Sequence, residues 1–164
     1  MNTQNNDNKV VLVIGAGDAT GGAIAKRFAR EGYIACVTRR SADKLQPLVD
    51  EIRAAGGQAH GFASDARKED EVAALVEQIE RCIGPIEAFV FNPGANVPCS
   101  ILAETARKYF KIWEMACFSA FLTAQAVARR MVTRGRGTIL FTGATAGLRG
   151  ASHFAAFTGA KHGV

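Results

Sequence analysis

A glycine-rich turn at residues 15–22 is the part of the chain whose residue types and spacing are best suited to binding an anion. It follows an apolar, β-branched run at residues 10–14, which predicts a strand buried on both faces of a parallel sheet. It precedes a helical pattern in which Ile24 and Phe28 face inward and Gly32 ends the helix. A strand, a glycine turn and a helix together direct backbone amides and a helix N-terminus toward an anion, usually a diphosphate. The alternative is an ordinary tight turn with no ligand.

The elements that must position this turn alternate between strands and helices along the chain. We expect further strands at residues 33–38, 58–64, 86–91 and 138–142. Helical patterns lie between them at residues 44–55, 69–82 and 104–134, and another helix begins at residue 155. This alternation predicts an α/β fold with a doubly wound parallel sheet in three αβα layers, of which the first five strands are present.

The helix expected at residues 104–134 is apolar on nearly all sides between residues 112 and 127. A helix with that pattern is usually buried, so we expect it to pack against both the sheet and another subunit. A homodimer or homotetramer is the expected assembly.

The composition favours one globular domain in the cytoplasm. The chain has 164 residues, of which 48% are hydrophobic and 21% charged, enough for one sizeable core. Residues 1–8 are polar and predict a loose tail, not a signal peptide, so residues 9–164 form the expected domain. The four cysteines lack CxxC spacing, and no uncharged apolar window is long enough to span a membrane. The net charge of +5 is scattered, so we expect neither nucleic acid nor a membrane as a partner.

Several short motifs make the chain similar to the short-chain dehydrogenase/reductase family along nearly its whole length. The glycine turn resembles the family's TGxxxGxG signature, with Gly15 and Gly21 in place, but with Ile14 and Ala19 at two other positions. Residues 91–94 resemble the Asn-Asn-Ala-Gly motif after the fourth strand, and Lys161 matches the lysine of the Tyr-x-x-x-Lys motif. The resemblance implies a Rossmann-type fold that binds NAD or NADP and acts on a small molecule.

The resemblance also implies which residues contact the cofactor. Asp65 follows the third predicted strand, where family members carry an acid that holds the adenine amino group. Lys161 has a non-catalytic role available, because in relatives the same ammonium bonds the nicotinamide ribose. The residues expected to contact the cofactor are Gly15, Gly17, Asp18, Thr20, Gly21, Arg39, Arg40, Asp65, Ala66, Asn92, Gly94 and Lys161.

The end of the second predicted strand favours NADP(H) over NAD(H). An acid there bonds the ribose hydroxyls of NAD, whereas a basic residue favours the 2′-phosphate of NADP. This chain has Thr38, Arg39 and Arg40 at that place and no acid. Asp18 argues the other way, because NADP-preferring relatives often carry Lys or Arg at its position. The alternative is that the two arginines are ordinary surface charges.

The catalytic positions implied by the resemblance depart from the family pattern. Family members transfer a proton through a Tyr whose pKa a Lys lowers, while a Ser orients the substrate oxygen and an Asn holds a relay water. In this chain Phe157 stands at the Tyr position, Ala144 at the Ser position and Ala116 at the Asn position. Only Lys161 is retained, and phenylalanine has no proton to transfer.

Two neighbouring side chains are candidates to substitute for the missing groups. His153 could act as an acid near neutral pH, although a loop histidine is more often a surface residue, and Thr145 could orient a substrate oxygen. Family members continue past the helix that begins at residue 155 with two further strands and a substrate-covering loop. We therefore expect the domain to be incomplete at its C-terminal end, which would leave the fifth strand as an apolar sheet edge.

These observations leave two functions open. The first hypothesis is an oxidoreductase that binds NADP(H) and transfers a hydride to or from an unknown carbonyl or alcohol. The alternative is a cofactor-binding pseudoenzyme, or an inactive partner subunit, that lacks the catalytic Tyr and Ser. A methyltransferase is disfavoured because its ribose site needs an acid near the end of the second strand, where Arg39 and Arg40 lie.

Overall fold

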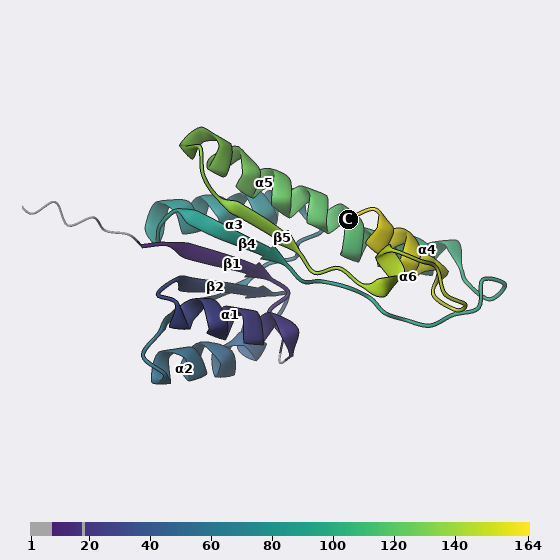
Figure 1. Ribbon diagram of the computed structural model, residues 1–164, viewed down its shortest axis with the longest axis horizontal. Helices are drawn as coiled ribbons and strands as arrows, with labels where there is room; N and C mark the ends of the chain where they lie inside the picture. Colours follow the sequence, from purple (N-terminus) through teal and green to yellow (C-terminus); the bar gives the residue numbers. More distant parts are fainter. Residues whose placement is uncertain (1–7, 18) are drawn as a thin grey trace, which may run out of the picture.

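Five parallel strands form one sheet at the centre of the molecule (Figure 1), whose computed structural model describes residues 8–17 and 19–164. The strands are β1 (Val10–Ile14), β2 (Ile34–Arg39), β3 (Gln58–Ala63), β4 (Ile86–Phe91) and β5 (Thr138–Phe141). Their order is β3-β2-β1-β4-β5, and every neighbouring pair is parallel. The predicted α/β fold with its five-stranded parallel sheet is confirmed.

Helices cover both faces of the sheet. The helices α1 (Thr20–Arg30) and α2 (Gln46–Ala54) lie on one face, and α3 (Glu69–Cys82) and α5 (Ser119–Arg134) lie on the other (Figure 1). Residues of β1 alternate between the two cores, because successive side chains of a strand point to opposite faces. Val11 and Val13 belong to the core under α1 and α2, whereas Val10, Leu12 and Ile14 belong to the core under α3 and α5.

The direction of winding reverses between β1 and β4. The chain adds β2 and β3 on one side of β1 and then crosses to its other side to form β4. Ile14 is in register with Phe91 at the carboxyl ends of these two strands, and the Asn92 amide donates a 3.1 Å hydrogen bond to the Ile14 carbonyl. In doubly wound sheets this reversal point is where ligands bind.

The helix expected at residues 104–134 is divided, which corrects that prediction. It consists of α4 (Ala106–Trp113), a π-helical turn η2 (Glu114–Phe118), and α5, and it begins two residues later than expected. Thr105 caps the start, since its hydroxyl accepts a 3.2 Å hydrogen bond from the Lys108 amide. The other predicted boundaries agree within two residues, except that the helix expected at 44–55 begins as the 3₁₀ turn η1 (Ala42–Leu45).

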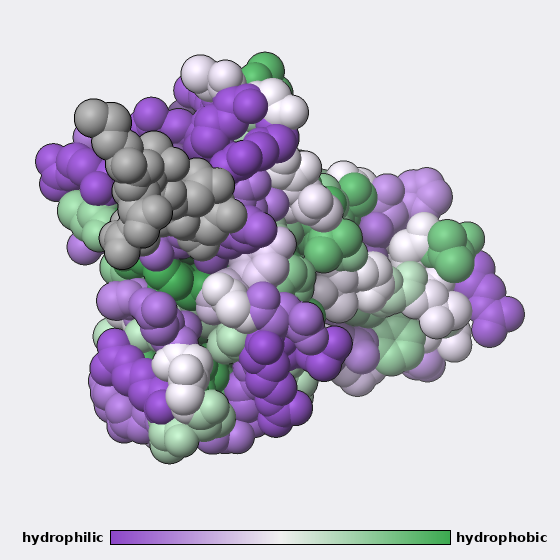
Figure 2. Space-filling view, turned by 60° about the vertical axis from the view of Figure 1, so that its left-hand side comes forward, coloured by the Kyte–Doolittle hydropathy of each residue, from purple (hydrophilic) through white to green (hydrophobic). Residues whose placement is uncertain are grey.

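One end of the molecule projects beyond the carboxyl ends of the strands. Figure 1 shows α4, α6 (Ala155–His162) and their flanking loops in this projection, and Figure 2 shows hydrophobic and hydrophilic residues intermixed on it. At the sheet edge, Leu140 and Phe141 of β5 are 45% and 40% exposed. Among the described residues, no helix has the length and apolar character needed to cross a bilayer.

Candidate functional site

The glycine turn has a steric reason for glycine at Gly15 and Gly21. Gly15 has φ +77°, and a Cβ on it would lie 3.0 Å from the Pro93 ring. A Cβ on Gly21 would collide with the Gly15 carbonyl oxygen, whereas a Cβ on Gly17 would meet no atom within 4 Å. Gly15 therefore permits the turn, Gly21 permits close packing, and Gly17 leaves open space beside the backbone.

Several backbone amides of this turn donate hydrogen bonds to carbonyls within the protein. The Gly15 and Ala16 amides both donate to the Thr38 carbonyl, at 3.2 and 3.1 Å, which ties the turn to the end of β2. The Gly17 amide donates to the Gly15 carbonyl at 3.0 Å. An anion would therefore be met by amides at the start of α1, where Thr20 and Gly21 lie. Asp18 lies outside the described residues.

A cavity of about 240 Å³ opens at the carboxyl ends of β1, β2, β3 and β4. It brings together six of the residues expected to contact a cofactor, which are Gly15, Arg39, Arg40, Asp65, Ala66 and Gly94. Its remaining lining residues are Ile14, Thr38, Ser64, Arg67, Pro93, Met115 and Ser119. A cavity of similar volume, about 250 Å³, lies between α1 and α2 and contains none of the expected residues. We refer to the first cavity as the nucleotide cleft.

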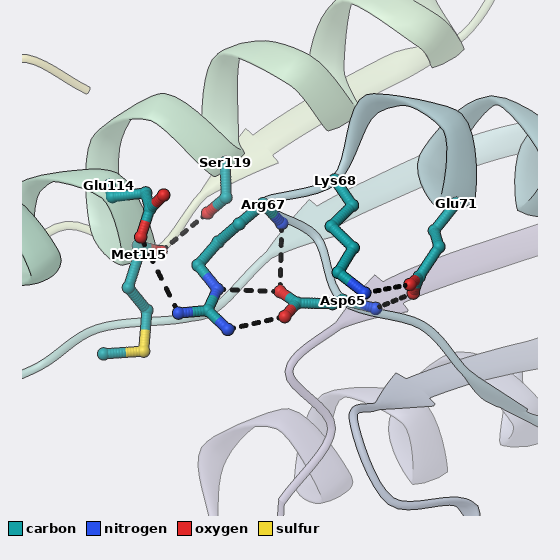
Figure 3. Close-up of polar contacts among 7 residues, drawn as sticks. All are labelled: Asp65, Arg67, Lys68, Glu71, Glu114, Met115 and Ser119. Atoms are coloured by element: carbon teal, nitrogen blue, oxygen red, sulfur yellow. Dashed lines mark hydrogen bonds and ion pairs between the residues drawn. The ribbon is translucent and has the colours of Figure 1, made fainter.

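An ionic network forms one wall of the nucleotide cleft (Figure 3). Arg67 donates to both carboxylate oxygens of Asp65, from Nε at 2.8 Å and from Nη2 at 2.5 Å, and its Nη1 lies 3.7 Å from Glu114 of η2. The hydrogen bond from the Arg67 side chain lowers the pKa of Asp65 to about 2. Lys68 and the Asp65 amide both bind Glu71, at 2.8 Å each. Asp65 is therefore ionised at neutral pH and linked to the helix junction.

A second network ties the other motifs together at the ends of β4 and β5. The Asn92 amide side chain donates to the Gly15 carbonyl at 3.1 Å and accepts from the Thr142 hydroxyl at 3.0 Å. The Lys161 Nζ donates to the Thr142 carbonyl at 2.8 Å and to the Pro93 carbonyl at 3.1 Å. Lys161 is 8% exposed, and its burial lowers the pKa of its ammonium. Residues from four distant parts of the sequence thus meet at one place.

Of the catalytic positions, Phe157 lies beside this second network, and none of the three supplies a hydroxyl. A Cβ on Gly94 would lie 3.4 Å from Lys161 Cε and 3.7 Å from the Phe157 ring, so these three residues are neighbours. Ala116 is fully buried in η2 and packs in one cluster with Ala156 and Ala160 of α6. The π-helical turn typical of functional sites is present, although an alanine occupies it.

The two candidate substitutes lie on the surface of the loop before α6. His153 is exposed with φ +67°, and its carbonyl accepts a 2.7 Å hydrogen bond from the Cys99 amide. Thr145 is exposed and begins the 3₁₀ turn η3 (Thr145–Gly147), directly after Ala144. This backbone hydrogen bond gives His153 a structural role, and neither the His153 nor the Thr145 side chain lines the nucleotide cleft.

Arg67 and Ser64 are among the cleft residues that the sequence analysis did not identify. Arg67 lies two residues after Asp65, a spacing at which a side chain can fold back onto the acid, and this was the available signal. Ser64 is 8% exposed, lines the cleft, and its hydroxyl has no hydrogen-bond partner in the described structure. A buried hydroxyl without a partner is rare, so Ser64 offers the cleft a free polar group.

Comparisons with known proteins agree with this geometry. A sequence model described as short chain dehydrogenase matches residues 9–164. A 7α-hydroxysteroid dehydrogenase of Escherichia coli is 34% identical over 137 residues, which are 82% of this chain and 52% of that protein. The structure of a short-chain dehydrogenase from Rhodopseudomonas palustris is 50% identical, with a TM-score of 0.89, over 95% of this chain and 73% of that one. The actinorhodin polyketide ketoreductase, solved with NADPH, is 30% identical, with a TM-score of 0.91, over 96% of this chain and 61% of that one.

The extent of these matches decides what they establish. The chain spans about three fifths of the length of the curated relatives that match nearly all of it. The family match nevertheless includes every strand of the sheet and both networks of the cleft. The chain belongs to the short chain dehydrogenase family.

Proposed function

We propose that the protein is an oxidoreductase that binds NADP(H) in the nucleotide cleft and exchanges a hydride with a carbonyl or alcohol. The observation that carries the proposal is the composition of the cleft at the end of β2. Arg39 and Arg40 line it, and none of the β2 residues is acidic. The ketoreductase solved with NADPH supports the choice, because it shares the fold over nearly the whole chain.

The residues that line the cleft, together with the glycine turn and the second network beside it, fit a dinucleotide. Gly17 leaves open space beside the turn, as close approach of a diphosphate requires, and Thr20 and Gly21 begin the helix whose N-terminus favours its charge. Asp65 and Ala66 would hold the adenine, while Asn92, Gly94 and Lys161 would hold the nicotinamide half. The nicotinamide supplies or accepts the hydride when bound.

The protein's own contribution to the chemistry would centre on Lys161. Its ammonium is fixed by two carbonyls beside Gly94 and Phe157, where relatives position their reacting groups. It would hold positive charge next to the substrate oxygen and could donate a proton to it from Nζ, because burial lowers its pKa. Phe157 presents an aromatic ring beside this place and moves no proton.

A second function is favoured by the residues at the catalytic positions. With Phe157 and Ala144 at the Tyr and Ser positions, the cleft would bind the cofactor without turnover, as in a pseudoenzyme or an inactive partner subunit. Titration with NADPH and NADH, followed by nicotinamide fluorescence, tests the shared part of both functions. Tight binding that prefers NADPH is expected, and failure to bind either nucleotide would exclude both. Turnover of carbonyl substrates by the unaltered protein would exclude the pseudoenzyme.

Self-association is part of the proposal. Four aromatic rings, Phe110, Trp113, Phe118 and Phe121, follow one another along α4, η2 and α5, with centroid separations of 6.0, 5.8 and 6.4 Å. Phe110 and Phe121 are 57% and 55% exposed, which is unusual for a row of large apolar side chains on a monomer. We name these four residues the aromatic row and assign it to contact with a second copy in a homodimer or homotetramer.

The proposal also includes the bounds of the domain and its cellular compartment. Residues 9–164 would act as one dinucleotide-binding domain, preceded by the polar tail of residues 1–8. Cys36 is fully buried, and burial raises the pKa of its thiol to about 12. The thiol therefore packs as an unreactive core residue, which is compatible with the reducing cytoplasm.

A further inference from the structure

A second concave surface adjoins the nucleotide cleft, on the face of α4 opposite the aromatic row. It is a groove of about 280 Å³. Its floor is formed by the apolar side chains of Ala95, Val97, Ile112 and Met115. Neither the family pattern nor the proposed cofactor accounts for this surface, which we call the α4 groove.

The α4 groove shares a wall residue with the nucleotide cleft. Met115 lines both surfaces, and Figure 3 shows its side chain extending beside the Arg67 guanidinium. Ala95 directly follows Gly94, the residue whose backbone lies against Lys161 and Phe157. A molecule whose reacting carbon lies near Lys161 can therefore extend its remaining atoms along the groove.

The rim of the α4 groove is cationic. Arg107, Lys108 and Lys111 line it, and Lys111 lies about one helical turn after the other two in α4. Residues 91–113 contain only one acid, Glu104, which lies 3.8 Å from Lys108, so the groove keeps a net charge of +2 from three cations less one acid. Arg107 and Lys111 have no hydrogen-bond or ion-pair partner among the described residues.

The loop that carries the floor is held in place from two sides. The Val97 amide donates to the Ala95 carbonyl at 3.0 Å, and the Cys99 amide donates to the His153 carbonyl at 2.7 Å. This second contact ties the groove to the loop that precedes α6 and Lys161. The groove is thus a pre-formed part of the catalytic end, as small-molecule sites usually are.

We propose that the α4 groove binds the distal part of the substrate, and that this part is an apolar chain ending in an anionic group. The apolar floor accepts the chain, and the free guanidinium and ammonium at the rim pair with the anion. A carboxylate and a phosphate ester share this chemistry. The inference rests on the proposed function, because it assigns the substrate class of the same cleft.

The test uses three probes that differ in one feature each: octanoate, octan-1-ol and acetate. Isothermal titration calorimetry should give measurable binding for octanoate, weaker binding for octan-1-ol and none for acetate. The double variant Arg107→Gln/Lys111→Gln should weaken octanoate binding by roughly fivefold to tenfold and leave octan-1-ol unchanged. The matched control Arg129→Gln/Arg130→Gln removes the same charge from the exposed face of α5 and should change neither. Replacing octanoate by octyl phosphate separates the two anion sources.

A further variant keeps the proposal falsifiable if the double variant folds poorly. Val97 lies in a loop, and its side chain is 45% exposed. Val97→Asp places an acid on the floor of the groove and should abolish octanoate binding. Equal affinity for octanoate and octan-1-ol, or loss of binding in the α5 control, would overturn the proposal. NADPH binding is measured separately: normal NADPH binding without octanoate binding refutes only the groove, whereas the reverse result refutes only the proposed cofactor.

Discussion

Arg67 occupies most of the acceptor capacity of Asp65. Its side chain donates to both carboxylate oxygens, at 2.8 and 2.5 Å, and its backbone amide donates to Oδ1 at 3.2 Å. An ionised carboxylate oxygen accepts about two hydrogen bonds, so Oδ1 is saturated and Oδ2 retains one place. An adenine amino group would therefore be accepted at Oδ2, next to the guanidinium.

The Asp65–Arg67 pair predicts a pH-dependent contribution to stability. The pKa of Asp65 is about 2 in the folded protein, against about 3.9 in an unfolded chain. The contribution is therefore present above about pH 4 and is lost as the pH falls toward 2. Arg67→Met should lower the free energy of unfolding by about 1 kcal/mol at pH 7, discounted for partial exposure, and by much less near pH 2. Urea unfolding at several pH values measures this difference.

The neighbouring cation supplies a control for that experiment. Lys68 pairs with Glu71 at 2.8 Å, but its side chain is 65% exposed. Lys68→Met should leave the stability unchanged within experimental error at both pH values. A loss as large as that of Arg67→Met would mean that net charge, and not the Asp65 pair, causes the effect.

Helices and strands with a clear hydrophobic pattern in the sequence were predicted well. Residues 69–82 and 86–91 form α3 and β4 with the expected boundaries, because amphipathic and β-branched patterns agree there with the final packing. The π-helical turn η2 could not be predicted in this way. One of its carbonyls, that of Met115, accepts a 2.6 Å hydrogen bond from the Ser119 hydroxyl, and hydrophobic periodicity does not encode such a bond.

The sequence motifs predicted individual residues of the candidate site, but not which of them lie close together. The sequence motifs identify Gly15, Asn92 and Lys161 separately, but only the sheet topology shows that they meet. The free hydroxyl of Ser64 depends on tertiary contacts that no spacing rule provides, whereas the spacing of Asp65 and Arg67 permits their pairing without requiring it.

Gly17 and Gly21 form a matched pair of sites for separating folding from binding. Gly21→Ala would place a Cβ against the Gly15 carbonyl oxygen and should lower the free energy of unfolding by about 1–3 kcal/mol. Gly17→Ala places its Cβ in open space and should leave stability nearly unchanged while weakening NADPH binding. Thermal unfolding and nucleotide titration of both variants give the two readouts. Equal destabilisation by the two variants would contradict the steric assignment.

Arg40 is the more exposed of the two cleft arginines and tests the cofactor preference. A charge-assisted hydrogen bond to a 2′-phosphate contributes about 1.5–3 kcal/mol. Arg40→Gln should therefore weaken NADPH binding by roughly tenfold or more and leave NADH binding unchanged, as measured by fluorescence titration. Arg81→Gln, at the end of α3, removes the same charge away from the cleft and serves as the control. A parallel loss of NADH affinity would mean that Arg40 supports the fold and does not select the phosphate.

The aromatic row predicts the surface of self-association. Phe121→Glu places a charge in the first turn of α5, where the native side chain is 55% exposed and contributes little to the core. The variant should remain folded and shift the protein to monomers in light scattering after size-exclusion chromatography. Val132→Glu, at an 80% exposed position of the same helix, is the control and should not change the mass. An unchanged mass in Phe121→Glu would exclude this face as the interface.

Restoring the missing phenol decides between the enzyme and the pseudoenzyme. Phe157 lies beside Gly94 and Lys161, so the hydroxyl of Phe157→Tyr would enter the space next to the ammonium. Because general acid catalysis contributes about 10²–10⁴-fold, Phe157→Tyr with Ala144→Ser should raise NADPH-dependent carbonyl reduction by roughly that factor if the rest of the site is competent. The same pair of substitutions combined with Lys161→Met should lose the gain, since the phenol then has no cation to lower its pKa. Activity that is already high in the unaltered protein and falls on restoring the Tyr would show that this chain uses a different proton donor. No activity in any variant, with NADPH binding intact, would favour the inactive partner subunit.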